Sequence, residues 1–371
     1  MGTLNRSLSL WILVLVQLLL LQSHLVRANY DSTARDLLDK SSKFFDCVFD
    51  GPAEHGFLDV ADFVPIFACP PKARVSWDCL KEVKLRLDAY PDTAKLPCPV
   101  SDPIYYHTIL VNSRSSVHVS MTKLLILSYL ATQNQKCSHL IVWLCEFDHG
   151  ATRLQDEFGD HSTVSFRLLV KETGISCPAE RVPGFSDYAR FAVLGMYGGI
   201  YTDIDFFFLR DMSPFWNIDF AYFWGRLPLL NTAVLGLRRG SPLAKLVTWQ
   251  TQGSTDPKYY HPFRFTRIMQ KRCGSSTIFN GFRAFPSVLF DPLWNIFDKV
   301  HEFVPGYSLN FTRFSGMLES PPPPDFTIQD FFPGSFGYHV HGQRKPILEG
   351  SYLDWFTRHF ENVVRTRSEE N

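Results

Sequence analysis

Residues 198–205 read Gly-Gly-Ile-Tyr-Thr-Asp-Ile-Asp, and this stretch places two carboxylates, Asp203 and Asp205, two positions apart. In an extended segment, side chains at alternate positions point to the same face. Both carboxylates can then reach one small volume, while Ile204 turns toward the core. Paired carboxylate oxygens suit a hard divalent cation such as Mg²⁺ or Mn²⁺, which commonly shares its ligands with substrate phosphates. The stretch therefore indicates a site that handles a nucleotide diphosphate.

Strands and helices alternate on both sides of this stretch. We predict Ser120 and Ser186 as helix N-caps, and Gly198-Gly199 as a helix stop. The alternation favours the α/β class with a mostly parallel sheet. The predicted strands are 104–111, 140–144, 164–170, 221–224, 232–237 and 337–340, and the predicted helices are 120–133, 186–197, 242–251, 265–271 and 352–364.

The composition is that of a globular protein. The chain has 371 residues, of which 45% are hydrophobic and 20% are charged. Lysine and arginine together number 37, as do aspartate and glutamate. Nucleic-acid-binding proteins usually carry a basic excess, so we expect no nucleic-acid partner.

We expect the N-terminal segment 1–28 to be a targeting signal. Residues 8–21 are almost entirely apolar and follow Arg6, but this run is short for a membrane span, which needs about 20 residues. Val26-Arg27-Ala28 loosely fits a cleavage site, whereas Leu25 extends the apolar stretch. The segment is either a cleaved signal peptide or a signal anchor. Both alternatives place the rest of the chain in the secretory lumen.

The chain contains eight cysteines, and an even number in an oxidising compartment favours disulfides. Four of them lie within 47–98, which indicates a Cys-rich extension over 29–100. No two cysteines form a CxxC pair, which argues against structural zinc. Cys145 lies in an apolar run and is a candidate buried free thiol. Asn310-Phe311-Thr312 fits the pattern of an N-glycosylation acceptor.

The run Ser186-Asp187-Tyr188-Ala189-Arg190, followed by Tyr197 to Asp205, resembles the sugar-binding region of DxD-containing glycosyltransferases. Fungal α-1,6-mannosyltransferases, lactosylceramide α-1,4-galactosyltransferases and the glucosylating clostridial toxins carry this region. Ser-Asp, Arg, Gly-Gly-Ile-Tyr and Asp-x-Asp occur together at the family spacing. The resemblance is strongest over 180–240, with a looser echo at Ala284-Phe285-Pro286 and Tyr338-His339-Val340.

The resemblance implies a fold of the glycosyltransferase-A type, with a Rossmann-like, mostly parallel sheet flanked by helices and preceded by the Cys-rich extension. The catalytic domain would be 101–366, with the DxD stretch beyond the carboxyl ends of the strands. The implied activity is metal-dependent transfer of a sugar, with retention, from a nucleotide sugar to a hydroxyl of a glycan, glycolipid or protein. We expect a UDP-sugar as donor and Mn²⁺ or Mg²⁺ as cofactor.

The expected location is the Golgi membrane, with a single-pass type II topology and a luminal catalytic domain. If the signal is cleaved, the protein is secreted or resides in the lumen of the endoplasmic reticulum.

The metal is expected to be held by Asp203, Asp205 and a histidine. Asp205 is predicted to bind it directly, and Asp203 to bind through water or to contact the ribose or sugar. Both are also the predicted catalytic residues. Related retaining enzymes supply a C-terminal histidine, and the Tyr-His-Val resemblance selects His339, with His341 as the alternative.

The substrate-binding predictions centre on Asp187 and Arg190. At positions i and i+3 of a helix they can form an ordinary ion pair, but the resemblance implies that both contact the donor sugar. The glycines can end the helix and also let a ligand approach the backbone closely. Tyr201 is expected to pack in the core or stack on the base. His107 and Arg283 are weaker cleft candidates. The full predicted substrate-binding set is Asp187, Arg190, Gly198, Gly199, Tyr201 and Asn231.

Two other functions are compatible with a DxD pair. Phosphohydrolases of the haloacid dehalogenase type use one, but their motif needs a hydrophobic strand immediately before it and Thr or Val two residues after it. Here Tyr201-Thr202 precedes the pair and Phe207 follows it. The remaining alternative is a non-catalytic luminal relative that binds sugars.

Overall fold

The computed structural model describes residues 98, 102–178, 184–216, 218–223, 230–252, 265–266, 268–269, 282–285, 287–292, 320–341 and 346–370. The chain divides into two compact units, 1–46 and 47–371, and all described residues belong to the second. The predicted signal segment, nearly all of the predicted Cys-rich extension and Asn310 lie outside the described residues. No helix in the described ranges is long and apolar enough to cross a membrane.

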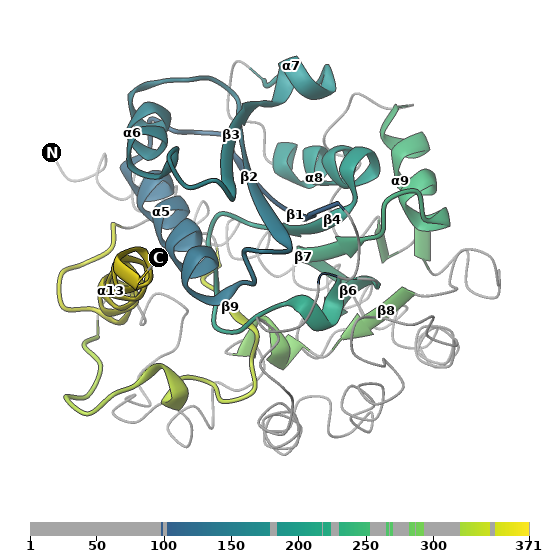
Figure 1. Cartoon of the computed structure of the whole chain (residues 1–371). Coiled ribbons are helices and arrows are strands. Elements are labelled where there is room, and N and C mark those ends of the chain that lie inside the picture. Colours follow the sequence, from purple (N-terminus) through teal and green to yellow (C-terminus); the bar gives the residue numbers. More distant parts are fainter. Residues whose placement is uncertain are drawn as a thin grey trace, which may run out of the picture. The chain divides into compact units, whose positions relative to one another are not determined.

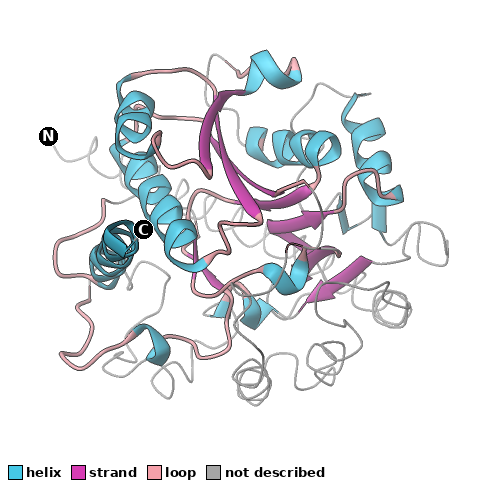
Figure 2. Ribbon diagram, in the orientation of Figure 1, coloured by secondary structure: helices cyan, strands magenta, loops and turns pink. Residues whose placement is uncertain are grey.

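Seven strands of the described chain form the central sheet, in the order β3-β2-β1-β4-β7-β6-β8 (Figures 1 and 2). β1 pairs in parallel with β2 and β4, β2 with β3, and β6 with β8, whereas β7 runs antiparallel to both of its neighbours. The predicted mostly parallel sheet is therefore confirmed. The strands are β1 (Ile104–Leu110), β2 (Ser138–Leu144), β3 (Val164–Leu168), β4 (Gly199–Thr202), β6 (Asp219–Phe223), β7 (Leu230–Leu237) and β8 (Phe282–Phe285).

Helices cover both faces of this sheet, which confirms the α/β class. α8 (Phe185–Tyr197) packs against β1 and α9 (Pro242–Gln252), while α5 (Ser116–Thr132) packs with α6 (His149–Phe158) and α13 (Tyr352–Glu370) on the other side (Figure 1). The short elements are α7 (Leu169–Thr173) and the 3₁₀ turns η2 (Ser213–Phe215), η4 (Ser287–Leu289) and η7 (Ile328–Asp330).

The core lies between the sheet and α5. Strand β2 is buried along almost its whole length, as expected for a parallel strand covered on both faces. α5 is apolar nearly all round because α13 covers its outer surface. Lys123 of α5 forms ion pairs with Glu157 of α6 (2.6 Å) and Glu361 of α13 (2.8 Å), which joins the three helices.

Both predicted N-caps are wrong. α5 is capped by Ser115, whose Oγ accepts a hydrogen bond from the His118 N–H, so Ser120 lies inside the helix. α8 begins after Gly184, which has a φ of +85°. Ser186 does not cap this helix, and its carbonyl oxygen accepts a hydrogen bond from Arg190 Nε (3.2 Å). A serine caps a helix only where its own backbone is extended, as it is at Ser115, and the sequence pattern does not reveal this.

The structure places two disulfides among the described residues. Cys145, directly after β2, bonds to Cys177 in the loop before α8, so the predicted free thiol is wrong. Cys145 is half-buried at the strand exit, where a partner can reach it. Cys98 bonds to Cys137 at the start of β2. The last cysteine of the predicted extension is therefore tied to the main sheet.

Candidate active site

The acidic stretch lies in a turn that follows β4. The Asp203 N–H donates to the carbonyl oxygen of Ala233 on β7 (2.8 Å), and the Phe206 N–H donates back to the Asp203 carbonyl oxygen (3.1 Å). The predicted extended conformation is therefore wrong, because the chain must turn here to leave the sheet and enter β5 (Phe206–Phe208). Ile204 is half-buried and packs against the core, as predicted.

A small two-stranded sheet brings the C-terminal histidine to this turn. β5 pairs antiparallel with β9 (Gly337–His339), with Phe206 opposite His339. The Val340 N–H donates to the Asp205 carbonyl oxygen (2.8 Å), which fixes the register beside the acidic residues. Three aromatic residues in a row, all fully buried, form β5 and hold it in the core.

The three predicted metal ligands converge. His339 Nε2 lies 3.3 Å from Asp205 Oδ1 and 3.9 Å from Asp203 Oδ2. Their ligand atoms all lie within 4.8 Å of one another. Two carboxylate oxygens and one imidazole nitrogen suit a divalent cation, and the nitrogen favours Mn²⁺ over Mg²⁺, which prefers oxygen ligands. The residues present therefore fit the implied metal.

The electrostatics of the cluster favour positive charge at His339. Burial lowers the pKa of His339, but the carboxylates of Asp205 and Asp291 outweigh this effect and raise it to about 10. Burial raises the pKa of Asp203, and the Arg190 guanidinium opposes this shift. In the absence of a cation, a proton on His339 thus balances the carboxylates, and a bound cation would take over that balance.

Arg190 organises the inner side of the site from α8. Its side chain is almost completely buried, and its five N–H groups can be matched to five protein acceptors. Nη2 reaches Asp187 Oδ1 (2.8 Å) and Asp203 Oδ1 (2.9 Å), and Nη1 reaches the carbonyl (2.7 Å) and hydroxyl (3.0 Å) oxygens of Thr232. Nε reaches the Ser186 carbonyl. Arg190 therefore ties together α8, the acidic turn and β7.

Tyr201 is buried and contacts the same network. Its hydroxyl donates to Asp203 Oδ1 (2.8 Å), and the Arg190 guanidinium lies over its ring at 4.6 Å. The predicted core packing of Tyr201 is confirmed. Its bond to Asp203 had no signal in the sequence, because it depends on the turn that follows β4.

The two glycines serve the protein backbone. Gly198 ends α8 with a φ of +67°, and a Cβ at this position would lie 2.5 Å from the Arg239 backbone nitrogen. Gly199 has a φ of +99°, and a Cβ there would overlap the Tyr105 carbonyl oxygen of β1. Both conformations favour glycine. The predicted helix-ending role is confirmed, whereas close approach of a ligand remains a prediction.

Asn231 supports the turn from β7. Its Oδ1 accepts a hydrogen bond from the Ala233 N–H (2.9 Å), and the Ala233 carbonyl oxygen receives the Asp203 N–H. The predicted substrate-binding role of Asn231 remains a prediction. In this structure the residue shapes the backbone to which the acidic turn is attached.

His107 has a structural role in the described chain. Its Nε2 bonds to the Gly198 carbonyl oxygen (2.8 Å), and its Nδ1 accepts from the Trp143 indole N–H (3.1 Å). Burial lowers its pKa to about 4. Both ring nitrogens of His107 are therefore bonded to protein groups. Arg283 is also bonded within the protein, through Nη1 to the Phe282 carbonyl oxygen (2.8 Å).

One residue beside the site was missed by the sequence reasoning. Asp291, fully buried after η4, lies 3.7 Å through Oδ2 from His339 Nδ1 and 2.6 Å from His341 Nε2. It stands in the run Phe290-Asp291-Pro292, far along the chain from the DxD pair. The looser family echo at 284–286 was the nearest signal.

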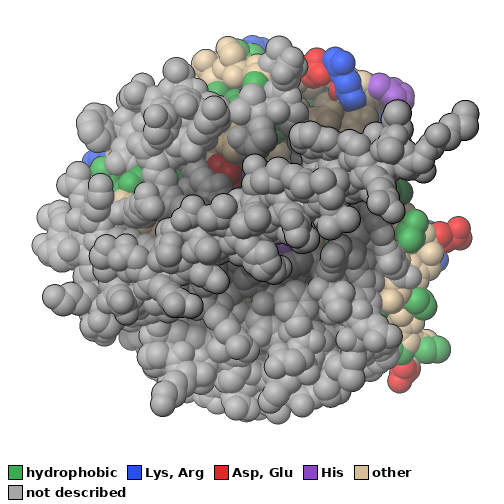
Figure 3. Space-filling view, turned by 180° about the vertical axis from the view of Figure 1, so that it is seen from behind, with side chains coloured by type: hydrophobic (Ala, Val, Ile, Leu, Met, Phe, Trp, Pro, Cys, Tyr) green, Lys and Arg blue, Asp and Glu red, His purple; other side chains and the backbone are tan. Residues whose placement is uncertain are grey.

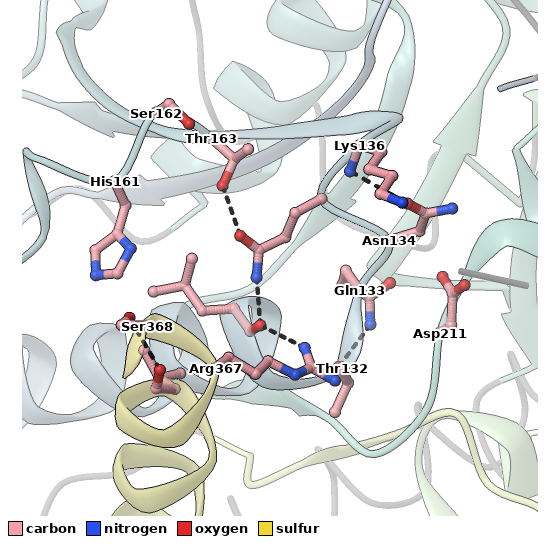
Figure 4. Close-up of a pocket in the computed structure, with 13 residues that line it drawn as sticks. Thr132, Gln133, Asn134, Lys136, His161, Ser162, Thr163, Asp211, Arg367 and Ser368 are labelled. Atoms are coloured by element: carbon pink, nitrogen blue, oxygen red, sulfur yellow. Dashed lines mark hydrogen bonds between the residues drawn. The ribbon is translucent and has the colours of Figure 1, made fainter. Parts of the chain in front are cut away.

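A cavity of about 730 Å³ lies at the opposite edge of the sheet, next to the starts of β2 and β3 (Figure 4). Many of its polar side chains already bond to protein groups. Thr163 donates to Gln135 Oε1 (3.2 Å), and Gln135 and Arg367 both donate to the Leu130 carbonyl oxygen. None of the predicted site residues lines it, so this cavity is separate from the candidate active site. In Figure 3, an acidic and a basic side chain of the described residues lie next to each other at the top of the visible face.

One segment of the chain matches a family of sugar-transferring enzymes. Residues 128–222 match the family described as "Glycosyltransferase sugar-binding region containing DXD motif". This segment runs from α5 to β6 and holds Asp187, Arg190, Asp203 and Asp205, but not His339. The predicted resemblance to DxD-containing glycosyltransferases is confirmed over this segment. None of the curated proteins compared with the sequence matches it significantly.

The solved structures to which this chain is distantly similar include three glycosyltransferases. The PaToxG glycosyltransferase shares 16% identity over 57% of this chain and 81% of its own, with a TM-score of 0.33. The galactosyltransferase LgtC, in complex with donor and acceptor sugar analogues, shares 14% over 71% and 96%, with a TM-score of 0.35. GlyE from Streptococcus pneumoniae TIGR4 shares 12% over 73% and 64%, with a TM-score of 0.36. These are distant likenesses.

Proposed function

We propose that this glycosyltransferase uses a divalent cation, Mn²⁺ or Mg²⁺, to transfer a sugar from a nucleotide sugar to a hydroxyl of a glycan, glycolipid or protein. A UDP-sugar is the proposed donor class, and retention at the anomeric carbon is the proposed outcome; both follow from the family resemblance. The observation that carries the proposal is the convergence of Asp203, Asp205 and His339 from two distant parts of the chain.

The chain's own residues divide the work between holding the cation and holding the donor. Asp205 Oδ1, His339 Nε2 and Asp203 Oδ2 would hold the cation. A cation bound there supplies Lewis-acid stabilisation of the leaving nucleotide diphosphate. Arg190 and Tyr201 both bond to Asp203 Oδ1, which leaves Oδ2 to face the cluster.

The donor sugar is proposed to contact Asp187, whose side chain remains 19% exposed and is oriented by Arg190. Arg190 itself is only 3% exposed and is bonded within the protein. Its contribution to sugar binding is therefore proposed to be the orientation of Asp187 and Asp203. The direct contact of Arg190 with the sugar, as the resemblance implied, would require one of its present bonds to open.

The proposed location is the secretory lumen, either as a Golgi type II membrane protein or as a secreted or reticular protein after signal cleavage. The two described disulfides support an oxidising compartment. N-terminal sequencing of the protein purified from cells distinguishes these possibilities. A mature chain that begins after residue 28 would exclude the anchor.

The function is tested by a donor screen on the purified full-length chain. UDP- and GDP-sugars are supplied one at a time with Mn²⁺, Mg²⁺ or EDTA, and release of the nucleoside diphosphate is measured. We expect turnover with a UDP-sugar and Mn²⁺, and loss of turnover with EDTA. Asp205→Asn should lower kcat/KM by at least about 100-fold, which corresponds to about 2.7 kcal/mol of transition-state stabilisation.

Asp156→Asn, at an exposed position of α6, is the matched charge control and should retain wild-type turnover. A folded Asp205→Asn variant with full activity would exclude the proposed metal role. Thermal stabilisation by a nucleotide sugar with no turnover on any acceptor would instead identify a non-catalytic sugar-binding relative.

A further inference from the structure

His339 has a second buried contact on the side away from the DxD pair. Its Nε2 faces Asp203 and Asp205, whereas its Nδ1 lies 3.3 Å from the Tyr222 hydroxyl and 3.7 Å from Asp291 Oδ2. Tyr222 and Asp291 are both fully buried, and His339 is 6% exposed. The imidazole is thus enclosed between two groups of oxygen atoms, one at each nitrogen.

Asp291 is itself fixed in place by two neighbours. The His341 Nε2 lies 2.6 Å from its Oδ2, and the Tyr222 hydroxyl lies 3.5 Å from the same oxygen. His341 has a φ of +60°, a backbone conformation that non-glycine residues adopt rarely, and this turns its side chain back beside the His339 ring at 4.0 Å. The backbone is therefore strained at His341, the residue whose side chain contacts Asp291.

A histidine that binds a metal through Nε2 must keep its lone pair there and its proton on Nδ1. Metal-binding histidines usually donate this proton to a carboxylate, a carbonyl or a hydroxyl, which sets the ring orientation and raises ligand basicity. The Tyr222 hydroxyl can accept from Nδ1–H of His339 and donate onward to Asp291 Oδ2. Because an ionised carboxylate only accepts hydrogen bonds, the hydroxyl donates to Asp291 and is free to accept from His339.

We propose that Asp291, with the Tyr222 hydroxyl as a bridge, is a positioning residue that holds His339 with Nε2 directed at the metal site. This inference rests on the proposed metal-dependent function and adds a requirement to it. It assigns a role to a carboxylate that lies outside the DxD stretch and outside the matched family segment. His341 orients the carboxylate by donating to Oδ2.

The same three residues, Asp291, His339 and His341, could in principle hold a second cation. Two observations favour the positioning role. The 2.6 Å separation of His341 Nε2 and Asp291 Oδ2 is that of a hydrogen bond, so a proton lies between the two atoms. A second cation would also require His339 to bind metal through both ring nitrogens at once.

The test is a Mn²⁺ titration of the full-length protein, with free Mn²⁺ measured from its electron paramagnetic resonance signal. Wild type should bind one Mn²⁺ per chain, and His339→Ala should lose this binding. Asp291→Ala should weaken Mn²⁺ affinity by about 10- to 100-fold. Asp291→Asn keeps an acceptor oxygen and should recover part of that loss.

Asp219→Asn is the matched control, because Asp219 is equally buried and bonds instead to the Arg238 backbone N–H (2.6 Å). It should leave Mn²⁺ affinity unchanged. Thermal melting identifies the variants that fold. If Asp291→Ala does not fold, Tyr222→Phe replaces it, and loss of the bridging hydroxyl should weaken Mn²⁺ binding several-fold.

The possible outcomes separate the two proposals. A folded Asp291→Ala, or Tyr222→Phe in its place, with wild-type Mn²⁺ affinity overturns the positioning role, while a loss of binding in His339→Ala still supports the metal site. Two Mn²⁺ per chain, with one lost in His341→Gln, overturns it in favour of a second cation. A wild-type chain that binds no Mn²⁺ overturns both proposals.

Discussion

The Tyr201 hydroxyl donates a 2.8 Å hydrogen bond to Oδ1 of Asp203, two residues along the chain. Arg190 Nη2 donates to the same oxygen, so Oδ1 is held from two sides. The other oxygen, Oδ2, is the one that faces His339 Nε2 at 3.9 Å. The Asp203 carboxylate thus has one oxygen bonded to the protein and one oxygen that faces the site. Tyr201 and Arg190 hold it in this orientation.

The first prediction concerns the Tyr201 hydroxyl. Tyr201→Phe removes one of the two bonds to Asp203 Oδ1 and leaves the ring in place. A hydrogen bond to a charged group contributes about 1.5–3 kcal/mol, and because Arg190 remains we expect the lower end, a roughly 10-fold weaker Mn²⁺ affinity. Tyr129→Phe removes a buried hydroxyl that bonds to Ser138 Oγ, remote from the site, and should leave the affinity unchanged. Equal effects of the two variants would show that the loss is not specific to Asp203.

The second prediction concerns the guanidinium of Arg190. Lysine keeps the charge but has three donors in place of five, so Arg190→Lys leaves acceptors among Asp187, Asp203 and Thr232 unpaired. Breaking a buried ion pair costs about 3–5 kcal/mol, and because the charge is retained we expect a loss of about 2–4 kcal/mol in the free energy of unfolding. Urea unfolding measures it. Arg153→Lys, exposed on α6, should change stability by less than about 0.5 kcal/mol.

The third prediction is a pH dependence of stability that originates at His107. Burial lowers its pKa to about 4 in the folded chain, whereas the unfolded value is about 6.5. Below pH 6.5 the unfolded state therefore binds a proton that the folded state does not, and stability falls until the pH reaches about 4. Between pH 7 and pH 5 this residue should cost about 2 kcal/mol.

His107→Gln removes this titration. Urea unfolding of both proteins at pH 7 and pH 5 checks the prediction: the variant is less stable at pH 7, but its loss of stability on acidification should be smaller by about 2 kcal/mol. An identical pH dependence in the two proteins would contradict the assignment of this titration to His107.

The fourth prediction concerns the Cys145–Cys177 disulfide. It links residues 32 positions apart and connects the end of β2 to the loop before α8. A loop of this length should lower the entropy of the unfolded chain enough to stabilise the fold by about 3–4 kcal/mol. The double variant Cys145→Ser, Cys177→Ser should unfold at lower urea concentration by this amount. Peptide mapping under non-reducing conditions should recover the two cysteines as one linked peptide, and free alkylated thiols at both positions would contradict the pairing.

The sequence predicted the elements that alternate strongly and the residues that carry the motif. β1, β7 and α8 lie where apolar periodicity places them, and Asp203, Asp205 and His339 converge as expected. The convergence could be predicted only from the family resemblance, because no local pattern connects position 205 with position 339. The N-caps of α5 and α8 were misplaced, since the backbone before each helix, and not the serine alone, decides where it starts.

Asp291 could not be found from sequence for a related reason. Its role arises because the end of η4 and the start of the turn after β9 meet behind His339. The tripeptide Phe-Asp-Pro is also common in surface loops, so it does not indicate a buried carboxylate. The burial of Asp291 is visible only in the folded structure. The disulfide partner of Cys145 was missed in the same way, because cysteine spacing does not determine connectivity.

The pairing of β5 with β9 has a consequence for biosynthesis. All seven strands of the central sheet and both carboxylates of the DxD pair precede β9 in the chain. During translation the sheet and its acidic turn can form while His339 has not yet been made. The proposed metal-binding cluster can be completed only when β9 adds to the edge of β5, and a nascent chain stopped before residue 337 carries the matched family segment without a complete cluster.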